Sequence, residues 1–297
     1  MEQKLLLIYN PISGKGNIKT YIGDIIDIYS EKNYCITVHP TKSQNDGYGY
    51  IKEHASEYDI ISICGGDGML NEAVSALMNV PADNRPPLAY LPTGSTNDFA
   101  GTIGLPIDVR RAAKMAVEGS PFFCDAGMLN DKFFAYVAAF GAFTSVSYDT
   151  AQEFKNLFGR TAYIVEGIRQ LASIKELHLK ITFDNGIIED DFIFGMVTNS
   201  LQVGGMKNNL NTAVSLNDGL FEVLLVKKPK NAVGYQNIIT AFLTQNIEKT
   251  TDIITFKAAK IKFESQEEIP WTVDGEFGGE STLTEITNLP KAFSVIV

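Results

Sequence analysis

The chain has 297 residues, 45% of them hydrophobic and 20% charged, which is typical of a globular protein with a buried core. Its formal net charge of −10 disfavours nucleic-acid binding and strong electrostatic adhesion to an anionic membrane, because both require a basic surface. No apolar run reaches the length of about 18 residues that predicts a membrane span, and the apolar run near the N-terminus is too short for a signal peptide. The well-separated cysteines, Cys35, Cys64 and Cys124, predict reduced thiols. We therefore expect a cytoplasmic protein.

The first 125 residues predict strands that alternate with helices. Apolar runs of strand length are followed by segments whose apolar residues recur at helical spacing. This alternation predicts a parallel sheet covered on both faces, in which ligands bind at the carboxyl ends of the strands. We expect strands at 4–9, 34–39, 60–64 and 88–91, and helices at 18–29, 48–56 and 70–78.

The stretch 58–78 organises this half of the chain. A buried-type strand runs into Gly65, Gly66 and Gly68 around Asp67, and an amphipathic helix follows. Such a strand, glycine turn and helix N-terminus can bind phosphate, because glycines let backbone N–H groups approach an anion. The alternative is a tight turn with an acid at the start of a helix. In the functional interpretation, Asp67 holds a metal shell, takes a proton or accepts a hydroxyl group.

Two further loops carry small and polar residues at the ends of predicted strands. The loop at 10–16 is not a Walker A loop, since no glycine lies five residues before Gly14 and no hydroxyl residue follows Lys15. Both phosphate contact and a plain turn stay open for it. The loop at 92–100 adds a glycine, hydroxyls, an amide and an acid. Because the carboxyl ends of parallel strands meet at one edge of a sheet, we expect both loops to converge with 65–72 on one site.

The second half of the chain predicts mainly antiparallel β structure. Asn185-Gly186 follows an alternating run and predicts a type I′ hairpin. One helix is expected at 161–173, packed on this half or lying on a membrane surface, and another at 233–245. The final run, 292–297, could pair in either half. Further strands are expected at 178–183, 192–199, 220–227, 261–264 and 271–273.

Two acidic places in this half have both a structural and a functional interpretation. Segment 215–220 reads Ser-Leu-Asn-Asp-Gly-Leu and predicts either a turn or a Mg²⁺ site with carboxylate and carbonyl ligands. Segment 274–276 reads Asp-Gly-Glu and predicts either a solvated turn or a general base, Glu276. None of the three histidines lies beside these loops, so a carboxylate is the natural base.

Four motifs, taken in order and spacing, span nearly the whole chain. They are Asn10-Pro11-x-Ser13-Gly14, Gly65-Gly66-Asp67-Gly68-x-Leu70-Asn71-Glu72, Pro92-x-Gly94-x-x-Asn97-Asp98-Phe99-Ala100 and Asp274-Gly275-Glu276. With these motifs the chain resembles the bacterial diacylglycerol kinase and lipid kinase family, whose catalytic domain is shared with sphingosine and ceramide kinases. The Gly-Gly-Asp-Gly motif alone is less specific, since NAD kinases and 6-phosphofructokinases also carry it.

The resemblance implies two domains with an active site in the cleft between them. Residues 1–125 would form an α/β nucleotide-binding domain with a parallel sheet, like that of NAD kinase and phosphofructokinase. Residues 126–285 would form a mainly antiparallel β-sandwich that contributes the catalytic base and a metal site, and segment 286–297 could return to the first domain.

The resemblance also implies roles for individual residues. Glu276 would take the proton from the lipid hydroxyl. Asp67 and Asp98 would hold the Mg²⁺ and water network near the phosphates. ATP would contact Asn10, Pro11, Ile12, Ser13, Gly14, Thr41, Gly66, Asp67, Gly68, Met69, Leu70, Asn71, Glu72 and Ser95.

The metal site and two departures from the family pattern concern both domains. The family's second-domain metal would be held by Asp218 and the carbonyls of Ser215 and Leu220. Asn217 occupies a place that is often acidic, which lowers the negative charge around the metal. Met69 stands where the family usually has Thr, which removes a hydroxyl from the start of the helix and could weaken nucleotide binding.

The loops and acids, together with the resemblance, predict an ATP- and Mg²⁺-dependent lipid kinase, and the resemblance implies diacylglycerol as the acceptor, giving phosphatidic acid. Phosphatidylglycerol, undecaprenol and other hydroxylated lipids stay open as acceptors. The rival classes are an NAD kinase-like enzyme, a dehydrogenase and a non-catalytic nucleotide sensor. Segment 97–100 argues against the first, Asn71 in place of the third glycine of G-x-G-x-x-G argues against the second, and the retained acids argue against the third.

The expected partner is a lipid substrate at the membrane surface, reached by peripheral contact of a cytoplasmic protein with the inner face of the membrane. No nucleic acid is expected, and a homodimer is left open. Lys227, Lys228 and Lys230 are interpreted either as a local basic patch for the membrane or as a plain solvated strand end.

Overall fold

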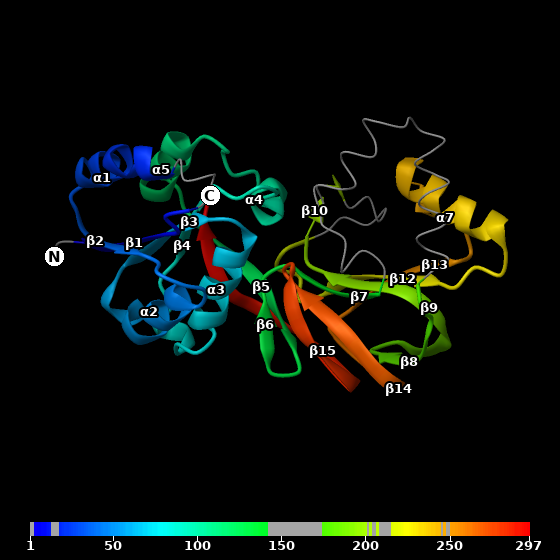
Figure 1. Ribbon diagram of the computed structural model, residues 1–297. Helices are drawn as coiled ribbons and strands as arrows, with labels where there is room; N and C mark the ends of the chain where they lie inside the picture. The colour runs from blue at the N-terminus through cyan, green and yellow to red at the C-terminus, as the bar shows by residue number, and fades with distance from the viewer. Residues whose placement is uncertain are drawn as a thin grey trace.

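The structure is a computed structural model and describes residues 3–12, 18–141, 174–200, 202–203, 206–207, 215–244, 246–247 and 250–297. In Figure 1 the segments coloured from blue through cyan to blue-green form one lobe, most segments coloured from green to orange form the other, and the last strand, in red, reaches back to the first lobe. The helix expected at 161–173 lies outside the described residues, as do Ser13 and Gly14.

Four strands of the first lobe pair in parallel. Strand β1 (Gln3–Tyr9) pairs with β2 (Tyr34–Pro40) and with β3 (Ile60–Gly65), and β3 pairs with β4 (Leu88–Pro92). All four lie where the apolar runs predict strands. Their carboxyl ends therefore share one edge of the sheet, which is the edge where such sheets bind ligands.

Helices cover both faces of these strands (Figure 1). Helices α1 (Ile22–Ser30) and α5 (Val109–Glu118) lie on one face, and α2 (Asp46–His54) and α3 (Asp67–Leu77) lie on the other. Successive strand residues point to opposite faces. They therefore divide between two apolar cores, one under each pair of helices.

The last strand connects the two lobes. Strand β15 (Glu276–Ile296) pairs antiparallel with β14 (Lys260–Val273) in the second lobe and with β5 (Pro121–Leu129), and its Val295 lies opposite Leu88 of β4 in parallel. The run 292–297 thus pairs beside the first-lobe strands. As a result the two lobes share one hydrogen-bonded sheet of thirteen strands.

Two long strands build the second lobe by changing partners along their length. Strands β9 (Gly186–Thr198) and β14 each pair antiparallel with β7 (Val137–Gly141) over one part and with β8 (Leu177–Phe183) over another. The four strands therefore close a circuit around an aromatic core, in which the Trp271 ring meets a phenylalanine ring edge-on at 5.0 Å between centroids.

The hairpin at 184–185 forms, but the prediction of its turn type is wrong. Gly186 belongs to β9 and pairs with Phe183, so Asp184 and Asn185 make the loop, and neither has positive φ. A type I′ turn needs positive φ at both central residues. Asp184 Oδ2 instead accepts the amide of Ala259 at 2.6 Å, which holds this turn against the residue that precedes β14.

The remaining elements are short or lie at the outer side of the second lobe. Helix α7 occupies almost the range 233–245 that the sequence predicts for it. These elements are η2 (Ala55–Glu57), η3 (Ala82–Asn84), α4 (Asp98–Ile103), β6 (Lys132–Phe134), β10 (Gln202–Val203), β11 (Met206–Lys207), β12 (Phe221–Lys227), α7 (Ala232–Thr244) and β13 (Ile253–Ala258).

Candidate active site

A cleft of about 1170 Å³ opens where the carboxyl edge of the parallel strands meets the β14–β15 turn and strand β6. Among the residues predicted to bind ATP or to catalyse, Asn10, Pro11, Ile12, Thr41, Gly66, Gly68, Met69, Asn71, Glu72 and Glu276 line this cleft. Its lining does not include Asp67, Leu70, Ser95 or Asp98. The loops after β1 and β3 therefore converge on one space as predicted, and the loop after β2 joins them. The loop at 92–100, which was also expected there, does not line the cleft and instead touches the β3 loop through Gly94 and Gly66.

Two glycine loops touch each other at the edge of the sheet. A Cβ atom added to Gly94 would lie 2.4 Å from the Cα of Gly66, which is far inside contact distance. The Gly94 loop is further held by Asn97, which has φ of 51° and whose side chain bonds both the amide and the carbonyl of Gly94 at 2.9 Å. A residue with a side chain at position 94 would separate the two loops.

Asp67 points toward helix α4. Its carboxylate accepts hydrogen bonds from the backbone amides of Asp98 at 3.1 Å and Phe99 at 3.4 Å and from the hydroxyl of Thr96 at 3.2 Å. Burial raises the pKa of Asp67 above its usual range, although these donors oppose the shift. Asp67 thus satisfies free amides at the start of a helix, where carboxylates are favoured.

The other predicted nucleotide residues around α3 have different surroundings. The Leu70 side chain is buried in the apolar core, while Ser95 is exposed on the loop before α4. Glu72 is half-buried and accepts the amide of Asn45 at 3.0 Å, which ties α3 to the loop before α2. Burial raises the pKa of Glu72, and the negative charges of Asp46 and Glu276 add to this shift.

The predicted base lies opposite the start of α3. Val273 and Glu276 pair across the β14–β15 hairpin, and the two residues between them, Asp274 and Gly275, have φ of 48° and 88°. Both central residues thus have the positive φ of a type I′ turn. The exposed Glu276 reaches over Gly68, where an added Cβ atom would lie 3.7 Å from Glu276 Oε1. The carboxylate therefore lies above the glycine turn that the sequence assigns to phosphate.

The buried Asp274 side chain anchors this turn to the neighbouring backbone. Its carboxylate is buried and accepts the backbone amides of Ala135 at 2.6 Å and of Tyr136 and Val137 at 3.0 Å each. The side-chain amide of Asn71 in α3, through Nδ2, donates to the same carboxylate at 2.7 Å. Burial raises the pKa of Asp274 to about 6 despite these donors. The sequence pattern assigned no role to Asp274 itself. The signal that could have found it is its place before Gly-Glu, where the backbone has positive φ.

Models of two protein families match this chain. The diacylglycerol kinase catalytic domain matches residues 4–129, and the YegS C-terminal NAD kinase beta sandwich-like domain matches residues 138–297. A diacylglycerol kinase of Bacillus subtilis (strain 168) is 33% identical over 293 residues, which are 98% of this chain and 95% of the relative. This chain belongs to the diacylglycerol kinase family.

Other members of the diacylglycerol kinase family agree in length and fold. A diacylglycerol kinase of Staphylococcus aureus (strain bovine RF122 / ET3-1) is 31% identical and covers 94% of this chain and 88% of its own. The crystal structure of a diacylglycerol kinase from Bacillus anthracis str. Sterne superposes with a TM-score of 0.75 at 26% identity, covering 99% of this chain and 96% of that one. The chain is accordingly an enzyme of the lipid kinase class, and kinase chemistry implies ATP as a substrate.

The predicted metal loop of this kinase lies away from the cleft lining. Asp218 Oδ1 accepts the amide of Leu220 at 3.1 Å, and Asp218 Oδ2 lies 3.4 Å from Lys257 Nζ. The amide of Gly219 donates to the buried Asp125 at 2.7 Å, which shapes the turn. One carboxylate with backbone carbonyls is a donor set that suits a hydrated Mg²⁺ ion. In the described part of the chain, however, no group of three or more His, Cys, Asp and Glu side chains is placed to hold a metal.

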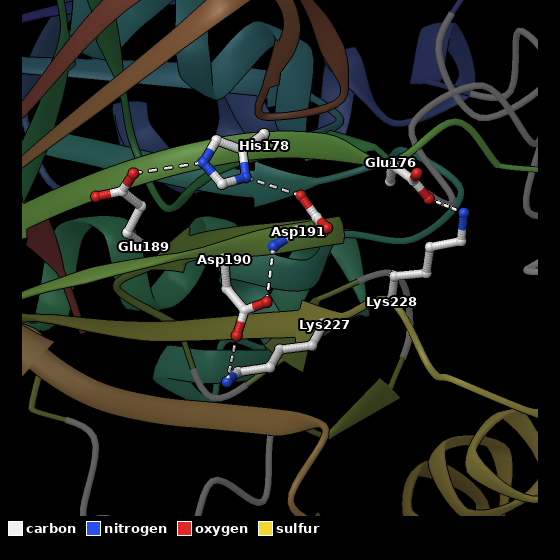
Figure 2. A network of polar contacts seen from close by, with 7 residues as sticks. All are labelled: Glu176, His178, Glu189, Asp190, Asp191, Lys227 and Lys228. Carbon is white, nitrogen blue, oxygen red and sulfur yellow. Dashed lines mark hydrogen bonds and ion pairs between the residues drawn. The ribbon is translucent and has the colours of Figure 1, made fainter.

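Two of the three lysines considered for membrane contact are paired with acids (Figure 2). Lys227 Nζ lies 2.6 Å from Asp190 Oδ2, and Lys228 pairs with Glu176. A patch whose ammonium groups face carboxylates attracts anionic lipid weakly. The structure therefore favours the solvated strand end over a basic patch for these two residues. Within the described residues, no helix combines the length and the hydropathy needed to span a membrane.

Proposed function

We propose that this lipid kinase transfers the γ-phosphate of ATP, bound as its Mg²⁺ complex, to the hydroxyl of diacylglycerol and releases phosphatidic acid. The observation that carries the proposal is the position of Glu276 over Gly68, because it places a carboxylate beside the N-terminus of helix α3. Backbone amides at such an N-terminus favour phosphate. The names of the relatives support diacylglycerol as the acceptor.

The proposed reaction uses the two sides of the cleft for its two substrates. The phosphates of ATP lie against the glycine turn at Gly66 and Gly68, and the acceptor hydroxyl faces Glu276. Glu276 accepts the hydroxyl proton, the acceptor oxygen bonds to the γ-phosphorus, and the bond from that phosphorus to the bridging oxygen breaks so that ADP leaves with the electron pair. Phosphoryl transfer depends mainly on positioning and charge neutralisation, which a rigid cleft can supply.

The acids that do not line the cleft receive supporting roles in this proposal. Asp67 holds the start of α4 through the amides of Asp98 and Phe99, and in this way keeps the two glycine loops in place. A resident Mg²⁺ would be held by Asp218 and the carbonyls of Ser215 and Leu220, where it would supply positive charge that fixes the loop.

Transfer of labelled phosphate from ATP to diacylglycerol in mixed micelles with Mg²⁺ tests the proposal. Wild-type protein should label the lipid, while Glu276→Gln should bind ATP normally and transfer at least about 100-fold more slowly, since a general base contributes about 10²–10⁴-fold. Near-normal transfer by Glu276→Gln would refute the base. Label in phosphatidylglycerol or NAD, with none in diacylglycerol, would refute the acceptor.

The proposal also places the enzyme at the inner face of the membrane, where its acceptor resides. Diacylglycerol has two acyl chains and stays in the bilayer, so the cleft must meet the lipid at the surface. Sedimentation with vesicles that contain diacylglycerol tests this contact, and vesicles without diacylglycerol are the control.

A further inference from the structure

Lys132 and Phe277 form a pair on the wall of the cleft that carries Glu276. Lys132 lies in β6 and Phe277 lies in β15, directly after the proposed base, and both line the cleft. Lys132 Nζ lies 5.7 Å from the centroid of the Phe277 ring, which is within the range of a cation–π contact. The pair thus joins a positive charge and an apolar ring beside the place where the acceptor hydroxyl must sit.

Neither residue is explained by the packing of the fold. The Phe277 side chain is 66% exposed, although a phenylalanine normally gains stability by burial. Among the ion pairs of the described residues, none involves Lys132, whereas Lys227, Lys228 and Lys257 all face carboxylates. An uncompensated ammonium group and an exposed ring, side by side in a cleft, are available to a ligand.

The charge of the cleft indicates which ligand the ammonium group serves. Glu72, Asp131 and Glu276 all line the cleft and repel a phosphate group, and the lysines that line it are Lys42 and Lys132. Lys42 follows the predicted ATP residue Thr41 after β2, whereas Lys132 lies on the wall of Glu276. Phosphorylation turns a neutral lipid hydroxyl into a phosphomonoester with about two negative charges. That anion forms beside Glu276, so a cation on the same wall would offset the repulsion.

Resting on the proposed function, we propose that Lys132 and Phe277 bind the acceptor side of the reaction. The Lys132 ammonium group contacts the phosphomonoester of the lipid product as it forms, and the Phe277 ring packs against the glycerol and the first acyl carbons. The ligand class is a phosphomonoester joined to an apolar chain. Its nucleotide partner binds elsewhere in the cleft and does not contact this pair.

Binding of the product in the absence of ATP tests the role of Lys132. The probe is dioctanoyl phosphatidic acid, and the variant is Lys132→Met. The dissociation constant should rise about tenfold, as expected for loss of one charge-assisted hydrogen bond, while the KM for ATP stays within about twofold of wild type. Lys132→Arg should restore most of the affinity.

The chain offers a matched control for this experiment. Lys52 Nζ also lies 5.7 Å from an aromatic ring, that of Tyr48, but Lys52 does not line the cleft. Lys52→Met should therefore leave product affinity unchanged.

Equal product affinity in Lys132→Met and wild type would overturn the assignment of Lys132. A rise in the KM for ATP that matches the loss of product affinity would also overturn it. Inorganic phosphate in place of the lipid should bind weakly to every variant, because it lacks the apolar part; tight binding of inorganic phosphate that Lys132→Met abolishes would show an anion site without lipid selectivity.

Phe277 has a separate prediction that isolates the apolar contact. Phe277→Ala should raise the KM for dioctanoylglycerol about tenfold with a smaller change in kcat, and Phe277→Leu should recover most of the lost affinity, since leucine restores apolar surface against the acyl chain. An unchanged KM in Phe277→Ala would remove Phe277 from the acceptor site.

Failure of this inference can be told from failure of the proposed function. If wild-type protein labels diacylglycerol and these variants behave like wild type, the inference fails and the proposed function stands. If wild type neither labels nor binds the lipid, the proposed function fails with it.

Discussion

Asn71 Nδ2 donates to Asp274 Oδ2 at 2.7 Å, so a helix of the first lobe is bonded directly to the turn that carries Glu276. Asn71 also donates to the carbonyl of Phe133 at 3.3 Å. Asp274 is held at the same time by three backbone amides of segment 135–137. The position of the proposed base relative to the start of α3 is therefore set by one buried carboxylate with four donors.

Removal of Asn71 should release this connection. Asn71→Ala leaves a buried carboxylate with one donor fewer, which we expect to lower the free energy of unfolding by about 1–2 kcal/mol. Displacement of Glu276 by a fraction of an ångström to 1 Å should lower kcat roughly 10- to 100-fold. Ser75→Ala is the control, because Ser75 lies one turn along α3 and bonds the same Phe133 carbonyl at 3.4 Å without contacting Asp274. A kcat for Asn71→Ala equal to that of Ser75→Ala would show that the connection does not position the base.

Asp274 should also make stability depend on pH. Burial raises its pKa from 3.8 to about 6, so the folded protein holds the proton more tightly than the unfolded chain does. Stability from this group is therefore greatest below pH about 4 and falls as the pH rises to about 6. The full effect is about 3 kcal/mol, from about 1.4 kcal/mol for each pH unit between the two pKa values.

Comparison with Asp274→Asn isolates that contribution from those of other carboxyl groups. Thermal unfolding of both proteins should be measured at pH values from 4 to 7. The free energy of unfolding of wild type should fall relative to that of the variant over this range, whatever the variant's stability at pH 4. Parallel curves for the two proteins would mean that the pKa of Asp274 is ordinary in the folded state.

The contact between Gly66 and Gly94 predicts the effect of a single methyl group. Gly94→Ala places a Cβ atom 2.4 Å from the Gly66 Cα, so the two glycine loops must separate. We expect ATP affinity to fall at least about tenfold and stability to fall by about 1–3 kcal/mol, the range for overpacking. Gly49→Ala in α2 is the opposite case, since no atom lies within 4 Å of its added Cβ, and alanine there should stabilise the helix by about 0.5–1 kcal/mol. Calorimetry measures the ATP affinity of both variants. Equal ATP affinities for Gly94→Ala and Gly49→Ala would contradict the predicted effect of the Gly66–Gly94 contact.

Local patterns predicted the positions of the elements better than they predicted side-chain contacts. The apolar runs and glycine turns placed β1, β3 and β4, because strand length and turn chemistry are local properties. They also predicted that the loops after β1 and β3 meet in the cleft, but the loop after β4 touches Gly66 without lining the cleft. The family motifs identified Glu276 and Asn71 as site residues. The bond from Asn71 to Asp274 was not predictable from spacing, since it joins residues 203 positions apart. The hairpin at 184–185 shows a further limit, because Asp184 there bonds Ala259, 75 positions away, and a local turn signal does not contain that contact.

Asp67 offers the sharpest test between a role predicted from family likeness and the observed geometry. As a member of the metal and water network, Asp67 would set the affinity for Mg²⁺; as observed, it accepts the amides of Asp98 and Phe99 at the start of α4. Asp67→Asn keeps the shape but turns one acceptor into a donor. We expect it to destabilise α4 by about 0.5–2 kcal/mol, as loss of a helix cap does, and to speed hydrogen exchange of the α4 amides. The Mg²⁺ concentration for half-maximal activity should stay within about twofold of wild type while kcat falls. A tenfold rise in that concentration with unchanged exchange at α4 would return Asp67 to the metal network and remove the supporting role proposed for it.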